Sequence, residues 1–223
     1  MTELSPLQKQ VLEAFAASSL HETFYWTGGT LLSAVYLHHR ASQDLDFFSD
    51  KPFSHDDVIG FVRALKTRLN LEHIEEKKIH DRWEFFLHNN EELRLEFVHY
   101  DHPSVGKRGT KNGVTVDSLD DIAANKLMAL VDRDEPKDVV DLYFLFTKAG
   151  YTPSKLIRFV ETKFGVRLSE SLVWSEALKV MRNLGVLKPL LLNESEQGGE
   201  QVLGEIKKYF NQKSKELLDR SLQ

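Results

Sequence analysis

The fold is decided by residues 23–48, which read TFYWTGGTLLSAVYLHHRASQDLDFF. They begin with an apolar and aromatic run, Thr23–Thr27, which predicts a strand. The pair Gly28-Gly29 breaks this strand, and Thr30 suits the N-cap of a helix through LLSAVYLHH. The run Asp44–Phe48 then alternates acidic and apolar residues with the two-residue period of a strand. We therefore predict the order strand, glycine turn, helix, strand.

Two carboxylates share one face of the second predicted strand, because Asp44 and Asp46 are two residues apart. Like charges this close are costly unless a cation lies between them. Magnesium prefers one or two carboxylates together with phosphate oxygens of a substrate, so the pair predicts a Mg²⁺ site. Glu96, on a later predicted strand, is a candidate third ligand. The alternative is a solvated strand edge, with Glu96 facing solvent.

The glycine turn is a second candidate site. The backbone amides of Gly28 and Gly29, at the positive end of a helix, can receive a phosphate chain. Glycines before a helix more often serve only as turn residues, so the turn alone is weak support for nucleotide binding.

Patterns outside residues 23–48 predict mostly helices. Ser118 and Asp121 have the spacing of a capping box, and Pro136 suits the first turn of a helix. Helices are predicted over residues 5–19, 54–70, 118–133, 136–150 and from 153 to the end, with a break at Gly198-Gly199; strands are predicted over 82–87 and 93–100, and a loop over 101–113.

The predicted helices 118–133 and 136–150 carry a third candidate group. Asp141 lies among apolar residues, so we expect it to be at least partly buried and to have a cationic or hydrogen-bonding partner. Lys126 is a candidate for that partner. A salt bridge that only ties the two helices together explains the pair equally well.

Composition limits the function. The 223 residues are 41% hydrophobic and contain no cysteine, so a substantial core is possible, whereas disulfides and thiolate metal sites are excluded. Residues 1–146 hold 16 Lys and Arg against 25 Asp and Glu, but residues 147–223 hold 13 against 9. The polar N-terminus and short apolar runs predict a soluble, cytoplasmic protein with no membrane segment.

Two runs of sequence together resemble one family. Gly28-Gly29-Thr30-Leu31-Leu32, followed by His39-Arg40-x-Ser42-x-Asp44-Leu45-Asp46-Phe47-Phe48, is similar to the first motif of the AbiEii/AbiGii toxin family of nucleotidyltransferases. Asp121-Ile122-x-Ala124-x-Lys126-Leu127-x-Ala129-Leu130-x-x-Arg133, followed by Lys137-Asp138-x-x-Asp141-Leu142, resembles that family's later helical motifs. The resemblance covers roughly residues 20–150.

The resemblance implies an α/β (α+β) fold of the polymerase-beta-like nucleotidyltransferase type, a mixed sheet flanked by helices and followed by a C-terminal helical region. It divides the chain into a catalytic core, residues 1–117, and a helical domain, residues 118–223. It implies Mg²⁺-dependent transfer of a nucleotide from an NTP to RNA, most readily the 3′ end of tRNA, by the toxin of an AbiE-type toxin–antitoxin or phage-defence system with a possible cognate antitoxin.

Residue roles follow from the same resemblance. The catalytic residues would be Asp44, Asp46, Lys126 and Asp141; the nucleotide would be bound by Gly28, Gly29, Thr30, Arg40, Ser42 and Lys126; Mg²⁺ would be bound by Asp44, Asp46 and Glu96. The basic C-terminal part would bind the acceptor RNA, through Lys155, Arg158, Lys163, Arg167, Lys179, Arg182 and Lys188. Two alternatives stay open: transfer to a protein or small molecule, and a noncatalytic nucleotide-binding or antitoxin-binding module.

Overall fold

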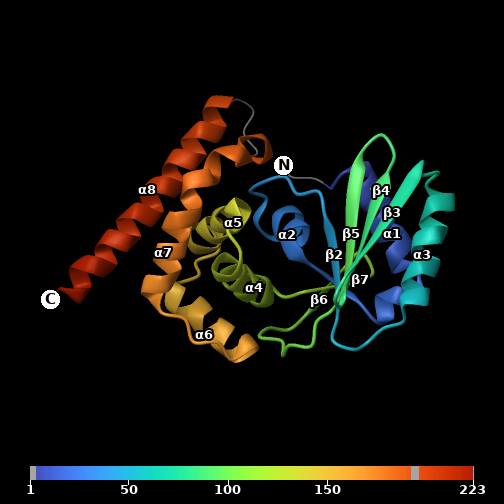
Figure 1. The fold of residues 1–223 in the computed structure, drawn as a ribbon, viewed down its shortest axis with the longest axis horizontal. Helices are drawn as coiled ribbons and strands as arrows, with labels where there is room; N and C mark the ends of the chain where they lie inside the picture. Colours follow the sequence, from blue (N-terminus) through green and yellow to red (C-terminus); the bar gives the residue numbers. More distant parts are fainter. Residues whose placement is uncertain (1–3, 192–195, 223) are drawn as a thin grey trace.

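The computed structural model describes residues 4–191 and 196–222. Within these ranges its centre is a mixed sheet of seven strands in the spatial order β3-β4-β5-β2-β1-β7-β6 (Figure 1). The strands are β1 (Tyr25–Thr27), β2 (Leu45–Ser49), β3 (His73–Ile79), β4 (Arg82–His88), β5 (Glu92–His99), β6 (Gly109–Lys111) and β7 (Val114–Val116). The predicted mixed sheet is confirmed.

Strand β2 occupies the middle of this sheet, antiparallel to β1 and parallel to β5. Its register places Asp46 between Thr27 on one neighbour and Glu96 on the other. Strand β4 pairs antiparallel with β5 and places Glu84 opposite Glu96. Acids that are far apart in the sequence therefore form a row across three adjacent strands.

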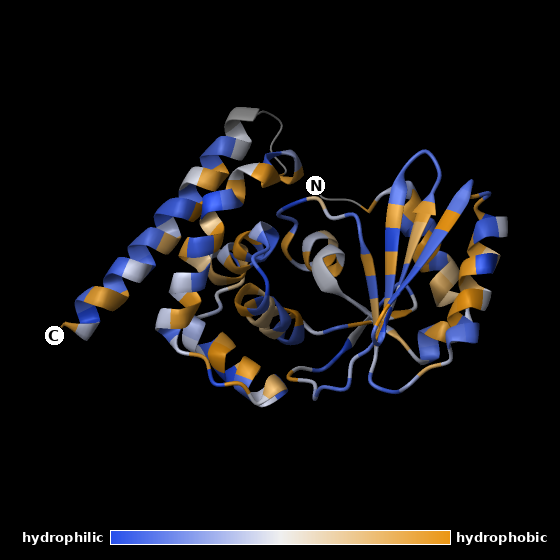
Figure 2. Cartoon of the chain, in the orientation of Figure 1, coloured by the Kyte–Doolittle hydropathy of each residue, from blue (hydrophilic) through white to orange (hydrophobic). Residues whose placement is uncertain are grey.

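One face of the sheet packs on α1 (Pro6–Ala16) and α3 (His55–Arg68) (Figure 1). Phe47 of β2 stacks on Phe15 of α1 with ring centroids 4.2 Å apart, and Phe15 meets Phe61 of α3 edge to face. Because side chains alternate along a strand, Asp46 faces the opposite side, toward the glycine turn and α4. The alternation of hydrophilic and hydrophobic residues along the strands is visible in Figure 2.

The chain after β7 is helical and lies on the side of the sheet opposite α1 and α3 (Figure 1). Its elements are α4 (Leu119–Asp132), α5 (Pro136–Thr147), α6 (Pro153–Phe164), α7 (Glu170–Val180), the 3-10 segment η3 (Met181–Leu190) and α8 (Glu196–Ser221). Phe146, Trp174 and Phe210 hold α5, α7 and α8 together, with ring centroids 5.8 to 6.5 Å apart. None of the helices in the described ranges has the length and apolar character that crossing a bilayer requires.

The helix after the glycine turn begins earlier than predicted. Helix α2 spans Gly28–Leu31 with Thr27, not Thr30, at its N-cap, and it continues as one π-helical segment, η2 (Leu32–Leu37). Thr30 does not cap the helix because its hydroxyl is hydrogen-bonded to the chain segment before β2, at Ser42 and the backbone oxygen of Asp44. The 3-10 turn η1 (Ser19–Glu22) shortens the predicted first strand to β1.

Two further predictions about secondary structure were wrong, and the edge strand β3 was not predicted. The segment His73–Ile79 forms the edge strand β3, although its charged sequence has no apolar alternation. The predicted loop 101–113 contains β6, which pairs with β7. Gly198-Gly199 does not break the last helix, because both residues lie within α8. A Cβ at Gly199 would lie 3.7 Å from the backbone oxygen of Lys188, so a small residue lets α8 pack closely on η3.

Candidate functional site

The acidic face of β2 opens into a cavity of about 760 Å³. The sheet side contributes the glycine turn, Asp44, Asp46 and Glu96, and the helical side contributes residues of α4 and of the segment that follows it, among them Lys126. The boundary expected at residues 117/118 falls between β7 and α4, so the sheet side of the cavity comes from residues before it and the helical side from residues after it. Charges of both signs line each side, because the sheet side also carries Arg40, Arg82 and Arg94, and the helical side also carries Asp132 and Glu135.

The glycine turn is shaped by Asp46. Gly28 has a φ of +80°, and a Cβ there would lie 1.7 Å from Oδ2 of Asp46. A Cβ on Gly29 would lie 2.8 Å from Nη2 of Arg40. Glycine is required at position 28 both for its backbone conformation and for the close approach of the carboxylate. Both glycines line the cavity, as do Arg40 and Ser42.

Asp44 and Asp46 face the cavity as the strand pattern predicted, and Glu96 is adjacent to Asp46 in the register. Burial and the charge of Asp44 raise the pKa of Asp46. Burial and the charge of Asp46 raise the pKa of Glu96 to about 7. Raised pKa values mark carboxylates whose negative charge is incompletely compensated, which is the condition a bound cation relieves.

Two arginines and a fourth acid complete this row. Arg94 donates to Oδ2 of Asp44 at 2.8 Å and to Oε1 of Glu84 at 3.2 Å, and Arg82 pairs with Glu96 at 2.8 Å. We did not identify Glu84, Arg82 or Arg94 from the sequence. The signal for Glu84 was its position between aromatic residues of a predicted strand, where an acid needs a partner.

The donors fit a divalent cation only with help from a substrate. Among the residues described, no group of three acidic or histidine side chains converges into a ready-made metal site. Magnesium is typically held by one or two carboxylates plus phosphate oxygens and water, and Asp44 and Asp46 on one strand face suit this arrangement.

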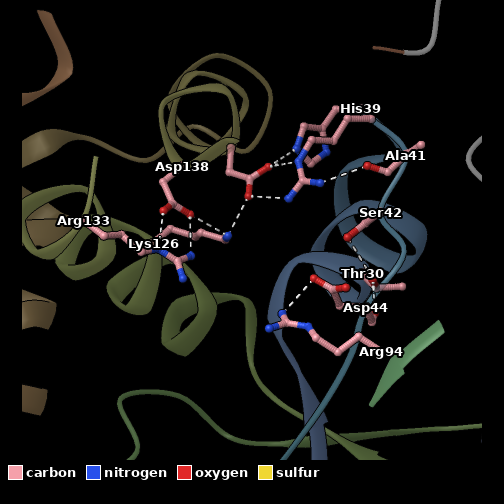
Figure 3. Close-up of polar contacts among 11 residues, drawn as sticks. Thr30, His39, Ala41, Ser42, Asp44, Arg94, Lys126, Arg133 and Asp138 are labelled. Atoms are coloured by element: carbon pink, nitrogen blue, oxygen red, sulfur yellow. Dashed lines mark hydrogen bonds and ion pairs between the residues drawn. The ribbon is translucent and has the colours of Figure 1, made fainter. Parts of the chain in front are cut away.

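Asp141 is at the centre of a buried ion cluster. Its partners His39 and Lys126 are labelled in Figure 3. Its oxygens lie 2.6 Å from Nε2 of His39, 2.7 and 2.9 Å from Nε and Nη2 of Arg40, and 2.8 Å from Nζ of Lys126. Burial alone would raise the pKa of Asp141, but Arg40 and Lys126 hold it well below its usual range. The expected burial of Asp141 and its pairing with Lys126 are confirmed, and the unexpected partners His39 and Arg40 come from the segment before β2.

Lys126 belongs to the same cluster and also reaches Asp138, whose Oδ1 lies 2.8 Å from Nζ. Burial opposes the charge of Lys126, but the carboxylates of Asp141 and Asp138 outweigh it and raise the pKa. Arg133 donates to the other oxygen of Asp138 at 2.9 Å. Lys126, Arg133 and Lys137 line the cavity as its cationic wall.

Two of the predicted site residues lie behind the cavity wall rather than on it. Thr30 is buried and hydrogen-bonded as described above, and Asp141 has no exposed surface. Asp141 holds Arg40, which lines the cavity beside Gly29, and Lys126, which lines the opposite wall. Asp141 therefore contacts one residue of each wall without lining the cavity itself.

The predicted RNA-binding residues are not equally available. Lys163 is buried and pairs with Asp121 at 2.7 Å, so its placement on an exposed RNA-binding surface was wrong. Its buried partner is the residue whose backbone amide is capped by Ser118. The other predicted basic residues that form ion pairs are Lys155, Arg167, Lys179 and Lys188, with Asp120, Glu161, Asp134 and Glu200 respectively.

The sheet, the acidic strand and the cationic wall define a nucleotidyltransferase, and comparison with known proteins identifies its family. Residues 10–190 match the family model described as nucleotidyl transferase AbiEii toxin, type IV toxin–antitoxin system. The chain belongs to the AbiEii family of nucleotidyltransferase toxins.

One curated protein and two solved structures are similar to the chain over most of its length. The uncharacterized protein aq_aa25 of Aquifex aeolicus is 30% identical over 168 residues, which cover 74% of this chain and 77% of that protein. The crystal structure of JHP933 from Helicobacter pylori superposes with a TM-score of 0.58 at 20% identity, covering 97% of this chain and 93% of that one. The structure of a putative nucleotidyltransferase from H. pylori gives 0.55 at 20% identity, covering 95% and 94%. At this identity the two structures support the fold alone.

Proposed function

We propose that this protein transfers a nucleoside monophosphate from an NTP to the 3′ end of an RNA, most readily tRNA, in a Mg²⁺-dependent reaction. The observation that supports the proposal is that one cavity is lined both by the acids Asp44, Asp46 and Glu96 and by the cations Lys126, Arg133 and Lys137. A triphosphate needs cations along its phosphates, and the metal that activates it needs carboxylates beside the α-phosphate.

Each wall has a separate task in this proposal. The amides of the glycine turn and the side chains of Lys126 and Arg133 would bind the β- and γ-phosphates, which leave as pyrophosphate. Asp44 and Asp46 would hold Mg²⁺, which supplies charge neutralisation at the transferred phosphoryl group.

The reaction forms one bond and breaks one. The RNA 3′-oxygen attacks the α-phosphorus, and the bond from that phosphorus to the bridging oxygen breaks. In this proposal Glu96, which lines the cavity beside Asp46, would accept the 3′-hydroxyl proton at a carboxylate oxygen; its pKa, raised to about 7, suits a general base near neutral pH. In the cell, the proposal places the protein in the cytoplasm as the toxin of a pair whose antitoxin blocks this transfer.

The test incubates the protein with Mg²⁺, total tRNA and each α-labelled NTP in turn, and compares it with Asp46→Asn. We expect label in tRNA from the unmodified protein and a loss of at least about 100-fold in the variant, because Asp46 positions the metal. Asp219→Asn is the matched control, since Asp219 is an exposed acid on α8.

Other outcomes would contradict specific parts of the proposal. Label on a protein band but not on RNA would overturn the acceptor and keep the chemistry. Full activity in a folded Asp46→Asn variant would overturn the metal site. Binding of NTP without transfer to any acceptor would favour a noncatalytic nucleotide-binding module.

A further inference from the structure

A row of aromatic side chains forms one end of the cavity, and the proposed phosphate and metal contacts leave it unused. Phe48 and Tyr100 have ring centroids 4.7 Å apart, Tyr100 and His102 are also 4.7 Å apart, and His102 and Phe164 are 5.0 Å apart. All four residues line the cavity. We propose that this row, which we call the aromatic wall, stacks a nucleobase of the reacting substrates.

The first support for this proposal is the position of the aromatic wall relative to the acids along β2. Asp44, Asp46 and Phe48 lie two residues apart on one strand face, so the row passes from Ser42 and the acids to the aromatic wall. Two residues of a strand span about 7 Å. One ribose ring, which separates a nucleobase from the phosphorus or 3′-oxygen of its nucleotide, bridges a comparable distance. A nucleotide reacting beside Asp46 therefore brings its base to Phe48.

Helix α4 lines the other side of the cavity. Asn125 accepts a hydrogen bond from the Tyr100 hydroxyl at 3.2 Å, which places this part of α4 at the aromatic wall. Arg133, just beyond the end of α4, belongs to the cationic wall. On the α4 side, Asn125 therefore lies at the aromatic wall and Arg133 lies at the far end of the helix, while Lys126, next to Asn125 in the chain, is paired with Asp138 and Asp141. A nucleotide with its base at the aromatic wall and its phosphates toward Arg133 matches this arrangement.

The polar groups at the aromatic wall suit a base better than a second phosphate. Because Oδ1 of Asn125 receives the Tyr100 proton, its Nδ2 is left as a donor; within residues 4–191 and 196–222 it has no partner. That amide can donate to a ring nitrogen or carbonyl of a base edge. Burial and the charge of Lys163 lower the pKa of His102, which keeps its imidazole neutral at pH 7.

The aromatic wall is also held in place before any base arrives. Lys163, fixed by its buried pair with Asp121, lies 5.5 Å from the ring centre of Tyr100. Met128 of α4 lines the same cavity and supplies apolar surface for the other face of a base. A preorganised aromatic surface loses little side-chain entropy on binding, which favours stacking of any base.

This inference rests on the proposed function, because it takes the substrates to be nucleotides. The base can belong to the incoming NTP or to the 3′-terminal nucleotide of the acceptor, since either has a base one ribose away from the reacting atoms. Binding measurements separate these sources and require no transfer. A protein that binds bases at the aromatic wall but transfers nothing would refute the proposed function and leave this inference standing.

The experiment titrates His102→Ala and Phe164→Ala with an NTP, with inorganic tripolyphosphate and with a short single-stranded RNA, all in Mg²⁺. We expect the affinity for the NTP or for the RNA to fall about 5- to 150-fold, which is the contribution of one base stack, and the affinity for tripolyphosphate to stay unchanged. Loss for the NTP alone identifies the incoming base, and loss for the RNA alone identifies the acceptor base. His102→Phe keeps a ring and should retain the affinity.

Phe159→Ala is the matched control, because Phe159 is on the same helix as Phe164 and half-buried but does not line the cavity. It should leave all three affinities unchanged. Unchanged affinity for both the NTP and the RNA in folded His102→Ala and Phe164→Ala would overturn the inference. A fall in tripolyphosphate affinity equal to the fall for the NTP would overturn it too, because the effect would then lie on the phosphates.

Discussion

Replacing Asp141 with Asn tests whether this acid joins the two walls of the cavity. The carboxylate accepts bonds from His39, Arg40 and Lys126 at 2.6 to 2.9 Å. An Asn keeps one acceptor oxygen and turns an NH₂ group toward cations. Removing one partner of a buried ion pair costs about 3–5 kcal/mol, because the remaining charge stays buried and uncompensated. The charge that loses its carboxylate partner is that of Arg40, whose side chain is only 3% exposed. Lys126 still has its ion pair with Asp138.

The expected loss is a large part of the total stability of a typical domain, which is about 5–15 kcal/mol. Urea unfolding at pH 7, followed by tryptophan fluorescence, measures it. The exposed-acid variant Asp219→Asn should stay within about 0.5 kcal/mol of the unmodified protein.

The contribution of Asp141 to stability should depend on pH in a defined direction. The pKa of Asp141 is held well below its usual range in the folded protein, so its contribution is complete above the unfolded value of about 4 and is lost as the pH falls below it. The stability difference between the unmodified protein and Asp141→Asn should therefore narrow below pH 4.

One result would refute this reasoning directly. If Asp141→Asn unfolds with the stability of the unmodified protein but transfers no nucleotide, Asp141 contacts substrate in the reacting complex and is not a positioning residue. A difference in stability that stays constant down to pH 2 would contradict the assignment of the lowered pKa to this cluster.

Two further predictions concern the acidic face. Gly28→Ala should reduce transfer by about 100-fold, because the added Cβ would displace the Asp46 carboxylate. Gly150→Ala is the control, since Gly150 has a similar φ of +73° but open space around it, and it should not reduce transfer. Equal activity of the two variants would contradict the clash with Asp46. Mg²⁺ should raise the melting temperature more at pH 8 than at pH 6, because the Glu96 carboxyl, with its pKa raised to about 7, loses its proton over this range. Asp46→Asn should abolish the increase, and an equal increase at both pH values would place the ion elsewhere.

Local patterns were sufficient to predict the acidic strand. The two-residue alternation of Asp44–Phe48 placed both aspartates on one face, and the structure confirms this through the stacking of Phe47 on the other face. The burial of Asp141 was also predictable, because a single acid within an apolar helix has to find a partner. Such inferences depend only on periodicity within one element.

Partners from distant elements were not predictable in the same way. Nothing near Asp141 in the sequence indicates His39 or Arg40, which reach it only because the segment after η2 passes beside α5. Glu84 joins Glu96 through the antiparallel register of β4 and β5, which the turn between them fixes. The edge strand β3 lacked a signal because its side chains are mostly exposed, so it needs no apolar alternation.

The placement of Arg40 explains why a buried helical acid matters for chemistry on a sheet. Its guanidinium lies against the glycine turn at Gly29 and is held from the other side by Asp141. The same carboxylate holds Lys126, on the wall that faces the acids. Rigid placement of charges on both sides of a reacting phosphate is the main contribution a protein makes to phosphoryl transfer. We therefore expect Asp141 to affect the proposed reaction mainly by fixing the distance between the two walls rather than by touching the substrate.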